Sequence, residues 1–271
     1  MSELFSVKEK VIVISGATGV LGSAMAKYLA SEGARVIVLG RNKAKVEALV
    51  EEIRNNDHYA FSAVADVTSE EALKTVFEEI QDEFGALDIL VNAAGGNMPG
   101  AVVMPDEDIM KSDLTSLQKV MELNYLGTFL PTKIFLPLLL KNNAGSIINI
   151  SSMAASRPMT RVMGYASAKA AVDNLTKWLS TEFAKKYGEG IRVNAIAPGF
   201  FLTEQNKTLL TKEDGSLTAR GQQIIQNTPM GRFGYPDELF GALHWLCSDA
   251  SKFVTGTIIP VDGGFSAYAG V

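Results

Sequence analysis

The 271-residue sequence has few of the residues that disulfides and metal centres require. It contains one cysteine, Cys247, and two isolated histidines, His58 and His244. A single thiol cannot form an internal disulfide, and these residues do not have the spacing of a zinc site. We therefore expect no metal centre and interpret Cys247 as a small hydrophobic residue packed in a helix.

Basic charge and long apolar runs are also scarce. Lys and Arg number 25 against 30 Asp and Glu, which gives a net charge of −5. Without a basic cluster to neutralise phosphates, a nucleic-acid partner is not expected. No uninterrupted apolar run approaches the ~18 residues that suggest a membrane span, and the N-terminus lacks a cleavable signal pattern. The sequence predicts a cytoplasmic protein with no membrane partner.

Segments typical of strands and of helices alternate along the whole chain. Seven short runs rich in Val and Ile predict strands at Val11–Ser15, Arg35–Leu39, Phe61–Ala65, Ile89–Val91, Ser146–Ile150, Arg192–Ile196 and Thr257–Val261. Helical patterns lie at Leu21–Ser31, Lys43–Asn55, Glu70–Phe84, Leu117–Asn142, Met163–Lys186 and Asp237–Leu246. Strands without polar alternation, separated by helices, predict the α/β class: a doubly wound parallel sheet with helices on both faces. We expect one domain over residues 1–271, with a kink at Pro131 and Pro137.

A glycine-rich turn joins the first predicted strand to the first predicted helix. The residues of interest are Gly16, Thr18, Gly19, Val20, Leu21 and Gly22. In this context glycines let the backbone approach a pyrophosphate, and the helix N-terminus offers unpaired N–H groups. The turn predicts a Rossmann-type dinucleotide site, with an ordinary tight turn as the alternative.

The residues that follow the second strand bear on the choice of cofactor. An acidic residue there would bind the ribose 2′-hydroxyl of NAD, whereas an arginine would meet the 2′-phosphate of NADP. Arg41 and Asn42 occupy this place, and no acid occurs before Glu47. The sequence favours NADP over NAD, although Arg41 could also be a solvated surface charge.

Two more strand ends carry candidate cofactor contacts. Asp66 and Val67 follow the third strand and could close over the adenine, or Asp66 could belong to a helix cap. Small residues follow the fourth strand and leave room for a ligand: Asn92, Ala93, Ala94 and Gly95. Asn124 lies inside a predicted helix, a position that disfavours Asn and therefore suggests a role.

Tyr165 and Lys169 are four residues apart and share one face of a predicted helix. A free phenol has a pKa near ~10, too high for acid–base work at neutral pH. A cation about 4 Å away contributes roughly 4 kcal/mol at an effective dielectric of about 20, or about three pKa units. Lys169 would thus make Tyr165 a proton donor and acceptor. The alternative is an amphipathic surface pair.

Together these motifs resemble the short-chain dehydrogenase/reductase family over nearly the full length. They are the glycine turn, Asn92–Gly95, Asn124, Ser152 with Tyr165 and Lys169, Pro198-Gly199, and Val261–Gly264. The resemblance implies a Rossmann fold with a seven-stranded sheet and a homo-oligomer, commonly a tetramer.

The resemblance also implies a role for each matching residue. Tyr165 would be the acid/base, and Lys169 would lower its pKa and hold the ribose. Ser152 would orient the substrate oxygen, and Asn124 would hold a proton-relay water. Pro198, Gly199 and Thr203 would contact the nicotinamide end. One departure is Val20, which stands where family members of this size have a glycine.

Segments of the C-terminal third resemble the D-mannonate oxidoreductase branch of this family, IAPGFFLTEQN and VTGTIIPVDGGFSAYAGV among them. That resemblance implies a keto-sugar acid substrate of the D-fructuronate/D-mannonate type. The alternatives are a reductase of a 3-oxoacyl group or of a small ketone or alcohol, and a dinucleotide-binding protein without turnover.

A sugar acid would need a cationic partner for its carboxylate, and arginine offers paired donors. Arg157 and Arg161 lie between Ser152 and Tyr165. Arg157 is the first choice because Pro158 stiffens the chain beside it, and Asn97 would donate from the opposite wall. Both arginines could instead be solvated or serve subunit contacts. Residues 204–228, with Lys207, are longer than a turn requires and predict a substrate lid.

Overall fold

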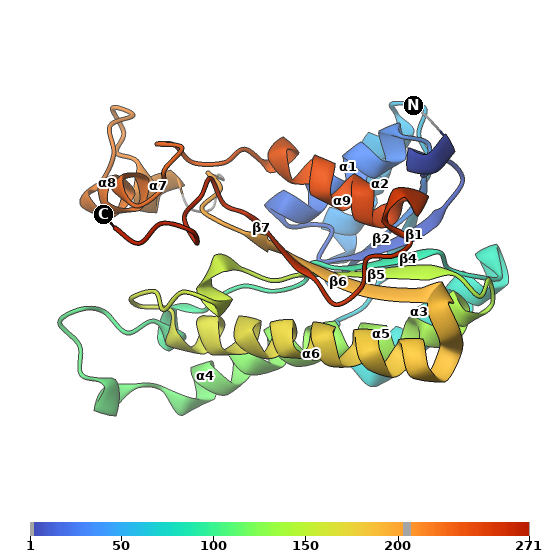
Figure 1. Cartoon of the computed structure of the whole chain (residues 1–271), viewed down its shortest axis with the longest axis horizontal. Helices are drawn as coiled ribbons and strands as arrows, with labels where there is room; N and C mark the ends of the chain where they lie inside the picture. Colours follow the sequence, from blue (N-terminus) through green and yellow to red (C-terminus); the bar gives the residue numbers. More distant parts are fainter. Residues whose placement is uncertain (1–2, 203–206, 271) are drawn as a thin grey trace.

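A parallel sheet of seven strands organises the computed structural model, which describes residues 3–202 and 207–270. The strand order is β3-β2-β1-β4-β5-β6-β7 (Figure 1). The strands are β1 (Val11–Ser15), β2 (Arg35–Gly40), β3 (Ala60–Val64), β4 (Ile89–Asn92), β5 (Gly145–Ile150), β6 (Ile191–Pro198) and β7 (Ile258–Val261). Every neighbouring pair is parallel, which confirms the predicted doubly wound sheet.

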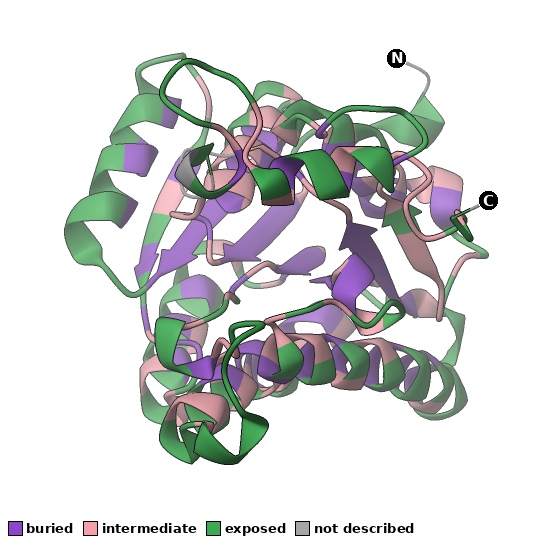
Figure 2. Ribbon diagram, turned by 90° about the vertical axis from the view of Figure 1, so that its left-hand side faces the viewer, coloured by how far each residue is buried: buried purple, intermediate pink, exposed green. Residues whose placement is uncertain are grey.

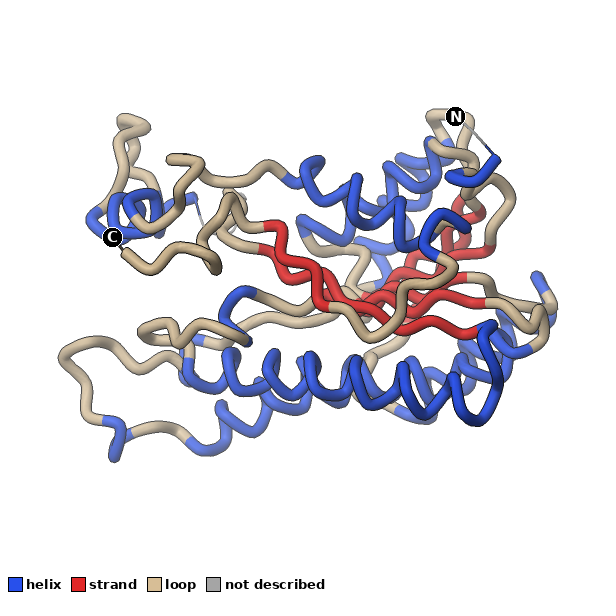
Figure 3. Tube along the Cα trace, viewed as in Figure 1, coloured by secondary structure: helices blue, strands red, loops and turns tan. Residues whose placement is uncertain are grey.

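Helices cover both faces of this sheet (Figures 1 and 3). One face carries α1 (Val20–Ser31), α2 (Lys43–Arg54) and α9 (Phe240–Cys247). The other carries α3 (Glu70–Phe84), α4 (Leu114–Met121), α5 (Gly127–Leu140) and α6 (Met163–Tyr187). Two short helices, α7 (Lys207–Leu210) and α8 (Ala219–Gln226), lie beyond the carboxyl ends of the strands.

Alternating side chains of each strand enter two separate cores. In β1, Ile12 and Ile14 pack with α1, α2 and α9, while Val13 packs with the helices of the opposite face. This division follows from the two-residue repeat of a strand. Figure 2 looks onto the carboxyl ends and shows the central strands buried. Burial on both faces explains why these strands read as continuous apolar runs.

The helical stretch from α4 to α5 contains a π turn at Glu122–Leu126. The sequence predicts a kink at Pro131 and Pro137, and α5 continues as one helix through both prolines. The π turn that carries Asn124 is a separate irregularity and ends five residues before Pro131. Single π turns of this kind occur frequently at functional sites.

Leu114–Leu140 is also long and apolar enough to cross a membrane by length and composition, which is weak evidence on its own. Half of its most apolar window is buried inside the protein. Phe135, Leu138 and Leu139 of α5 are fully buried in the core beside α3 and α6. Packing against the sheet accounts for this apolar character.

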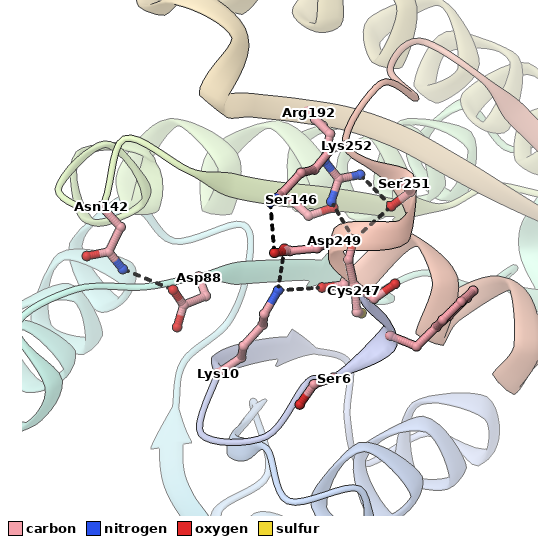
Figure 4. Close-up of polar contacts among 12 residues, drawn as sticks. Ser6, Lys10, Asp88, Asn142, Ser146, Arg192, Cys247, Asp249, Ser251 and Lys252 are labelled. Carbon is pink, nitrogen blue, oxygen red and sulfur yellow. Dashed lines mark hydrogen bonds and ion pairs between the residues drawn. The ribbon is translucent and has the colours of Figure 1, made fainter. Parts of the chain in front are cut away.

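A polar network ties the amino-terminal ends of β1 and β6 to the end of α9 (Figure 4). Lys10 Nζ donates to the carbonyl of Cys247 at 3.3 Å and contacts Asp249 at 3.2 Å. Buried Arg192 donates to the carbonyl of Leu246 at 3.0 Å. Cations at a helix C-terminus satisfy its free carbonyls and its dipole. Because this network lies away from the carboxyl ends of the strands, we interpret it as structural.

Cys247 lies within this network and is buried, as the sequence predicts. Burial raises the pKa of its thiol to about 12. Because the thiolate is the reactive form of cysteine, this thiol is chemically inert at neutral pH.

The described part of the predicted lid, residues 207–228, is folded around a small hydrophobic cluster of its own. Leu210, Ile224 and Phe233 are its buried members, and Phe200 packs against them. A bridge between Thr211 and Leu217 closes the loop between α7 and α8. Closure over a ligand stays a prediction.

Candidate active site

A cavity of about 590 Å³ opens at the carboxyl ends of the strands. Its size falls within the range of cofactor and small-molecule sites. Most of the candidate residues meet in it. Those lining it are Gly16, Thr18, Gly19, Val20, Leu21, Gly22, Arg41, Asn42, Asp66, Val67, Ala93, Ala94, Gly95, Ser152, Tyr165, Lys169, Pro198 and Gly199.

Sequence reasoning missed several lining residues, among them Lys45, Leu123, Ile150, Phe200 and Phe201. Lys45 could have been found, since Asn42 caps α2 by accepting from the Lys45 N–H at 3.1 Å, which keeps this first turn beside Arg41. The aromatic pair follows Pro198-Gly199 directly. Thr203, predicted to contact the nicotinamide end, lies outside the described residues.

The glycine turn is shaped by close backbone contacts. Gly16 has a φ of +66°, and a Cβ there would lie 2.6 Å from the backbone of Ala94. A Cβ on Gly22 would lie 2.2 Å from the Gly16 carbonyl oxygen. Val20 is the first residue of α1 and has Gly19 as its N-cap, so the turn needs no glycine at Val20. Val20, Leu21 and Gly22 of the first helical turn line the cavity, and N–H groups at a helix N-terminus are suited to bind a phosphate.

Gly16→Ala should weaken cofactor binding at least about tenfold, because a positive φ and a backbone clash each cost roughly 1 kcal/mol or more. The matched control is Gly19→Ala, at φ −82° with its nearest contact at 3.3 Å. It should change the dissociation constant less than about threefold, as a weaker N-cap only. Titration of cofactor fluorescence measures both. Equal losses of cofactor affinity in the two variants would show that the close contact of Gly16 with Ala94 is not required for cofactor binding.

Tyr165 lies in the first turn of α6, and Lys169 lies one turn further. Lys169 is buried, and its Nζ lies 5.7 Å from the centre of the Tyr165 ring. The same Nζ donates to the Ile150 carbonyl at 2.7 Å. Ser152 caps the short 3-10 turn that follows β5, and its Oγ accepts from the Ala154 N–H at 3.1 Å. The helix and the end of β5 thus bring all three side chains to one wall of the cavity.

Burial is the largest influence on the pKa values of Tyr165 and Lys169. It raises the pKa of Tyr165, while a hydrogen bond with Ser152 lowers that pKa in part. Burial also lowers the pKa of Lys169 to about 8, against the opposing charge of Asp173. The prediction that Lys169 lowers the pKa of Tyr165 by about three units is therefore wrong for this structure. It assumed a solvated charge about 4 Å from the phenol and left out the desolvation of both groups.

Asn124 is fully buried in the π turn and holds the loop that follows β4. Its Nδ2 donates to the Gly96 carbonyl at 2.8 Å, and its Oδ1 accepts from the Gly96 N–H at 3.1 Å. A Cβ on neighbouring Gly95 would lie 2.6 Å from Asn124 Oδ1 and 3.0 Å from Lys169 Nζ. Asn124 therefore positions the cavity wall beside Lys169. The relay water stays a prediction.

Asn92 does not line the cavity, contrary to its prediction as a cofactor contact. Its Nδ2 donates to Thr132 Oγ1 at 3.0 Å and to Asn149 Oδ1 at 2.9 Å. The side chain at the end of β4 thus points into the layer between the sheet and the helices. It joins β4 to β5 and α5.

The three candidate substrate residues outside the catalytic set also lie away from the lining of the cavity. Arg157, the first choice, donates through Nε to the carbonyl of Ser266 at 3.0 Å, so it anchors the C-terminal segment. That contact contradicts the expectation of a free carboxylate-binding group. Arg161 has a φ of +76°, and its buried Nε has no hydrogen-bond partner among the residues that the structure describes. Asn97 is exposed.

Comparison with known proteins places this geometry in context. A family model described as enoyl-(acyl carrier protein) reductase matches residues 16–266. An uncharacterized oxidoreductase, UxuB, of Bacillus subtilis is 45% identical, covering 97% of this chain and 96% of its own.

Two solved structures share the whole fold. A proposed D-mannonate oxidoreductase from Haemophilus influenza with bound NAD is 42% identical, with a TM-score of 0.92 and 98% of each chain covered. A gluconate 5-dehydrogenase from Burkholderia cenocepacia, in complex with NADP and tartrate, is 31% identical with a TM-score of 0.86. There the match covers 98% of this chain and 99% of the other. With the parallel sheet, the glycine turn and the Ser152, Tyr165 and Lys169 wall, these matches show that the chain is a nicotinamide-dependent oxidoreductase of the short-chain dehydrogenase/reductase family.

Proposed function

We propose that this enzyme is an NADP-preferring oxidoreductase of a keto-sugar acid, interconverting D-fructuronate and D-mannonate. One observation carries the reaction class: the wall of Ser152, Tyr165 and Lys169 faces the same cavity as the glycine turn. The sugar-acid substrate is supported by the resemblance of the C-terminal segments and by the relatives' described activities.

The residues present fit a dinucleotide. Gly16 and Gly22 leave no room for a Cβ, so the backbone itself forms the cradle, and the first-turn amides of α1 supply donors. Gly199 packs equally closely on Asp262, where a Cβ would lie 2.6 Å from Asp262 Cα. When bound, the nicotinamide supplies or accepts the hydride.

The proton chemistry belongs to this chain's own side chains. Tyr165 Oη gives a proton to the substrate oxygen in reduction and takes it back in oxidation. Ser152 hydrogen-bonds the same oxygen and orients it. Lys169 stabilises the phenolate while Tyr165 is deprotonated, which is the moment when a nearby cation is most valuable in a dry site.

The preference for NADP is proposed from the far end of the cavity. Arg41, Asn42 and Lys45 line it there, and no carboxylate directly follows β2. Asp66 lies nearby, but its Oδ1 accepts from the Thr68 N–H at 2.9 Å and from Thr68 Oγ1 at 2.7 Å. A 2′-phosphate would thus meet two cations. The two solved relatives hold NAD and NADP respectively.

Arg41→Ala should lower kcat/KM with NADPH by about 10- to 150-fold, the loss expected for one charged hydrogen bond. The value with NADH should change little, because NADH has no 2′-phosphate. Lys43→Ala is the control, since Lys43 pairs with Glu47 at 3.7 Å on the exposed side of α2. Equal losses with both cofactors would contradict the assignment of Arg41 to the phosphate.

The substrate class is tested by comparing three kinds of carbonyl compound. D-Fructuronate should be reduced with a higher kcat/KM than a 3-oxoacyl thioester or an apolar ketone. Preference for either of the latter would favour the alternative reading of an acyl or small-ketone reductase. Assembly as a homotetramer and a cytoplasmic location stay predictions from the resemblance and the composition.

A further inference from the structure

Arg161 is a cation without a partner in the part of the chain that the structure describes. Its side chain forms no ion pair or hydrogen bond with any residue the structure describes, and its Nε is buried. Its backbone has a φ of +76°, a conformation unfavourable for an arginine, and the Val103 N–H holds its carbonyl at 3.1 Å. Buried polar groups are normally satisfied, and strained residues gather at ligand sites. This residue lies four positions before Tyr165.

Arg220 is a second such cation and belongs to α8, in the predicted lid. It is half-buried, and within residues 3–202 and 207–270 its side chain has no ion pair or hydrogen bond. It occupies the first turn of α8, where the helix dipole already disfavours a positive charge. Burial, and then the charge of Arg161, lower the pKa of Arg220. The positive charge of Arg161 is thus unfavourable for that of Arg220.

The Arg161 loop and the chain after α8 both contact the same C-terminal segment, Gly263–Ser266. On one side, Arg157 of the Arg161 loop binds the carbonyl of Ser266. On the other, the chain after α8 is fixed by the Met230 N–H, which donates to the Gly263 carbonyl at 3.1 Å. Ile224 of α8 packs with Phe200, which lines the catalytic cavity. The two arginines thus lie on elements next to this cavity, although neither lines it: the loop between Ser152 and Tyr165, and α8.

We propose that Arg161 and Arg220 together bind the carboxylate of the substrate, one from the loop before Tyr165 and one from α8. This inference rests on the proposed sugar-acid function and adds its recognition site. A carboxylate accepts paired N–H donors from a guanidinium and would relieve the repulsion between the two charges. Arg157 is then an anchor of the C-terminal segment and not a ligand for the substrate.

Three hexoses that differ only at C6 separate the contributions of charge and shape. D-Fructuronate has a carboxylate there, D-fructose a hydroxymethyl group, and D-fructose 6-phosphate a phosphate. Arg161→Gln and Arg220→Gln should each raise KM for D-fructuronate about 10- to 150-fold, and far more than for D-fructose. Arg220→Lys should recover part of the loss because it keeps the charge. Lys212→Gln is the matched control: it removes an exposed cation from the loop between α7 and α8 and should leave the ratio of the two KM values unchanged.

A binding measurement keeps the test independent of turnover. Calorimetric titration of D-mannonate into Tyr165→Phe protein should show binding that either arginine substitution weakens. Without ligand, each substitution should leave the unfolding temperature unchanged or raise it, because it removes one of two repelling charges.

The possible outcomes distinguish the proposed arginine site from the proposed function. Equal effects on D-fructuronate and D-fructose, or D-mannonate binding that survives both substitutions, would overturn the arginine site and spare the proposed function. Arginine-dependent preference for D-fructose 6-phosphate would overturn the carboxylate in favour of a phosphate. If the wild type fails to reduce D-fructuronate but binds D-mannonate through both arginines, the proposed function is contradicted and the arginine site is supported.

Discussion

Replacing Tyr165 with Phe is expected to lower kcat by about 10²- to 10⁴-fold, the usual contribution of a positioned acid or base. In the proposed mechanism, the phenol of Tyr165 is the group that transfers a proton to the substrate oxygen. Phe keeps the ring, its packing in the first turn of α6 and its contact with the ammonium of Lys169. Cofactor affinity should therefore change little.

Steady-state kinetics and a cofactor titration on the same protein measure these two effects. Tyr187→Phe is a matched control at the far, exposed end of α6. It should leave kcat unchanged. Tyr165→Phe protein with wild-type kcat would remove Tyr165 from the proton step, and a large loss of cofactor affinity would make its role structural instead.

Replacing Lys169 with Met is expected to lower kcat by about 10²- to 10³-fold, the scale of removing one stabilising group from a dry site. It should also change how stability depends on pH. The folded-state pKa of Lys169 is about 8, below the 10.5 of a free lysine. The unfolded chain therefore binds more protons between these values, and wild-type stability rises with pH across this window.

Below about pH 8 the buried ammonium lowers the free energy of unfolding by its full amount, and above about pH 10.5 it no longer lowers it. Between pH 7 and 10 the wild type should gain about 2–3 kcal/mol of unfolding free energy relative to Lys169→Met. Loss of the hydrogen bond to Ile150 shifts the variant's curve without changing its slope. Urea denaturation at several pH values measures the difference, with Lys177→Met on the exposed side of α6 as the control. If the stabilities of wild type and Lys169→Met had the same dependence on pH, the pKa of Lys169 would not be lowered by folding.

Most of the fold follows from patterns that are local in the sequence. β1 and β4 are continuous apolar runs because helices cover both of their faces. All six predicted helical stretches appear with shifts of a few residues at their ends, and the π turn divides Leu117–Asn142 into α4 and α5. The glycine turn was also predictable, since its geometry depends on contacts between near neighbours such as Gly16 and Gly22. Even Val20 is explained locally, as the first residue of α1.

The direction of individual side chains was not predictable in the same way. Asn92 ends a strand beside the cavity, but its amide donates to Asn149 of the neighbouring strand β5 and to Thr132 of α5. The choice of Arg157 failed because its partner, Ser266, is more than a hundred residues away in the sequence. The proposed pairing of Arg220 with Arg161 was not predictable for the same reason, because nothing near Arg220 in the chain relates it to Arg161. Desolvation of Lys169 likewise depends on the folded environment.

The most direct test of the proposed function is to identify the product formed from D-fructuronate. Purified enzyme, NADPH and D-fructuronate should consume cofactor and sugar acid in equal amounts, and NMR of the mixture should show D-mannonate. Tyr165→Phe protein under the same conditions should give at most about a hundredth of that rate. No oxidation of NADPH or NADH with D-fructuronate, together with turnover of apolar ketones, would contradict the sugar-acid assignment.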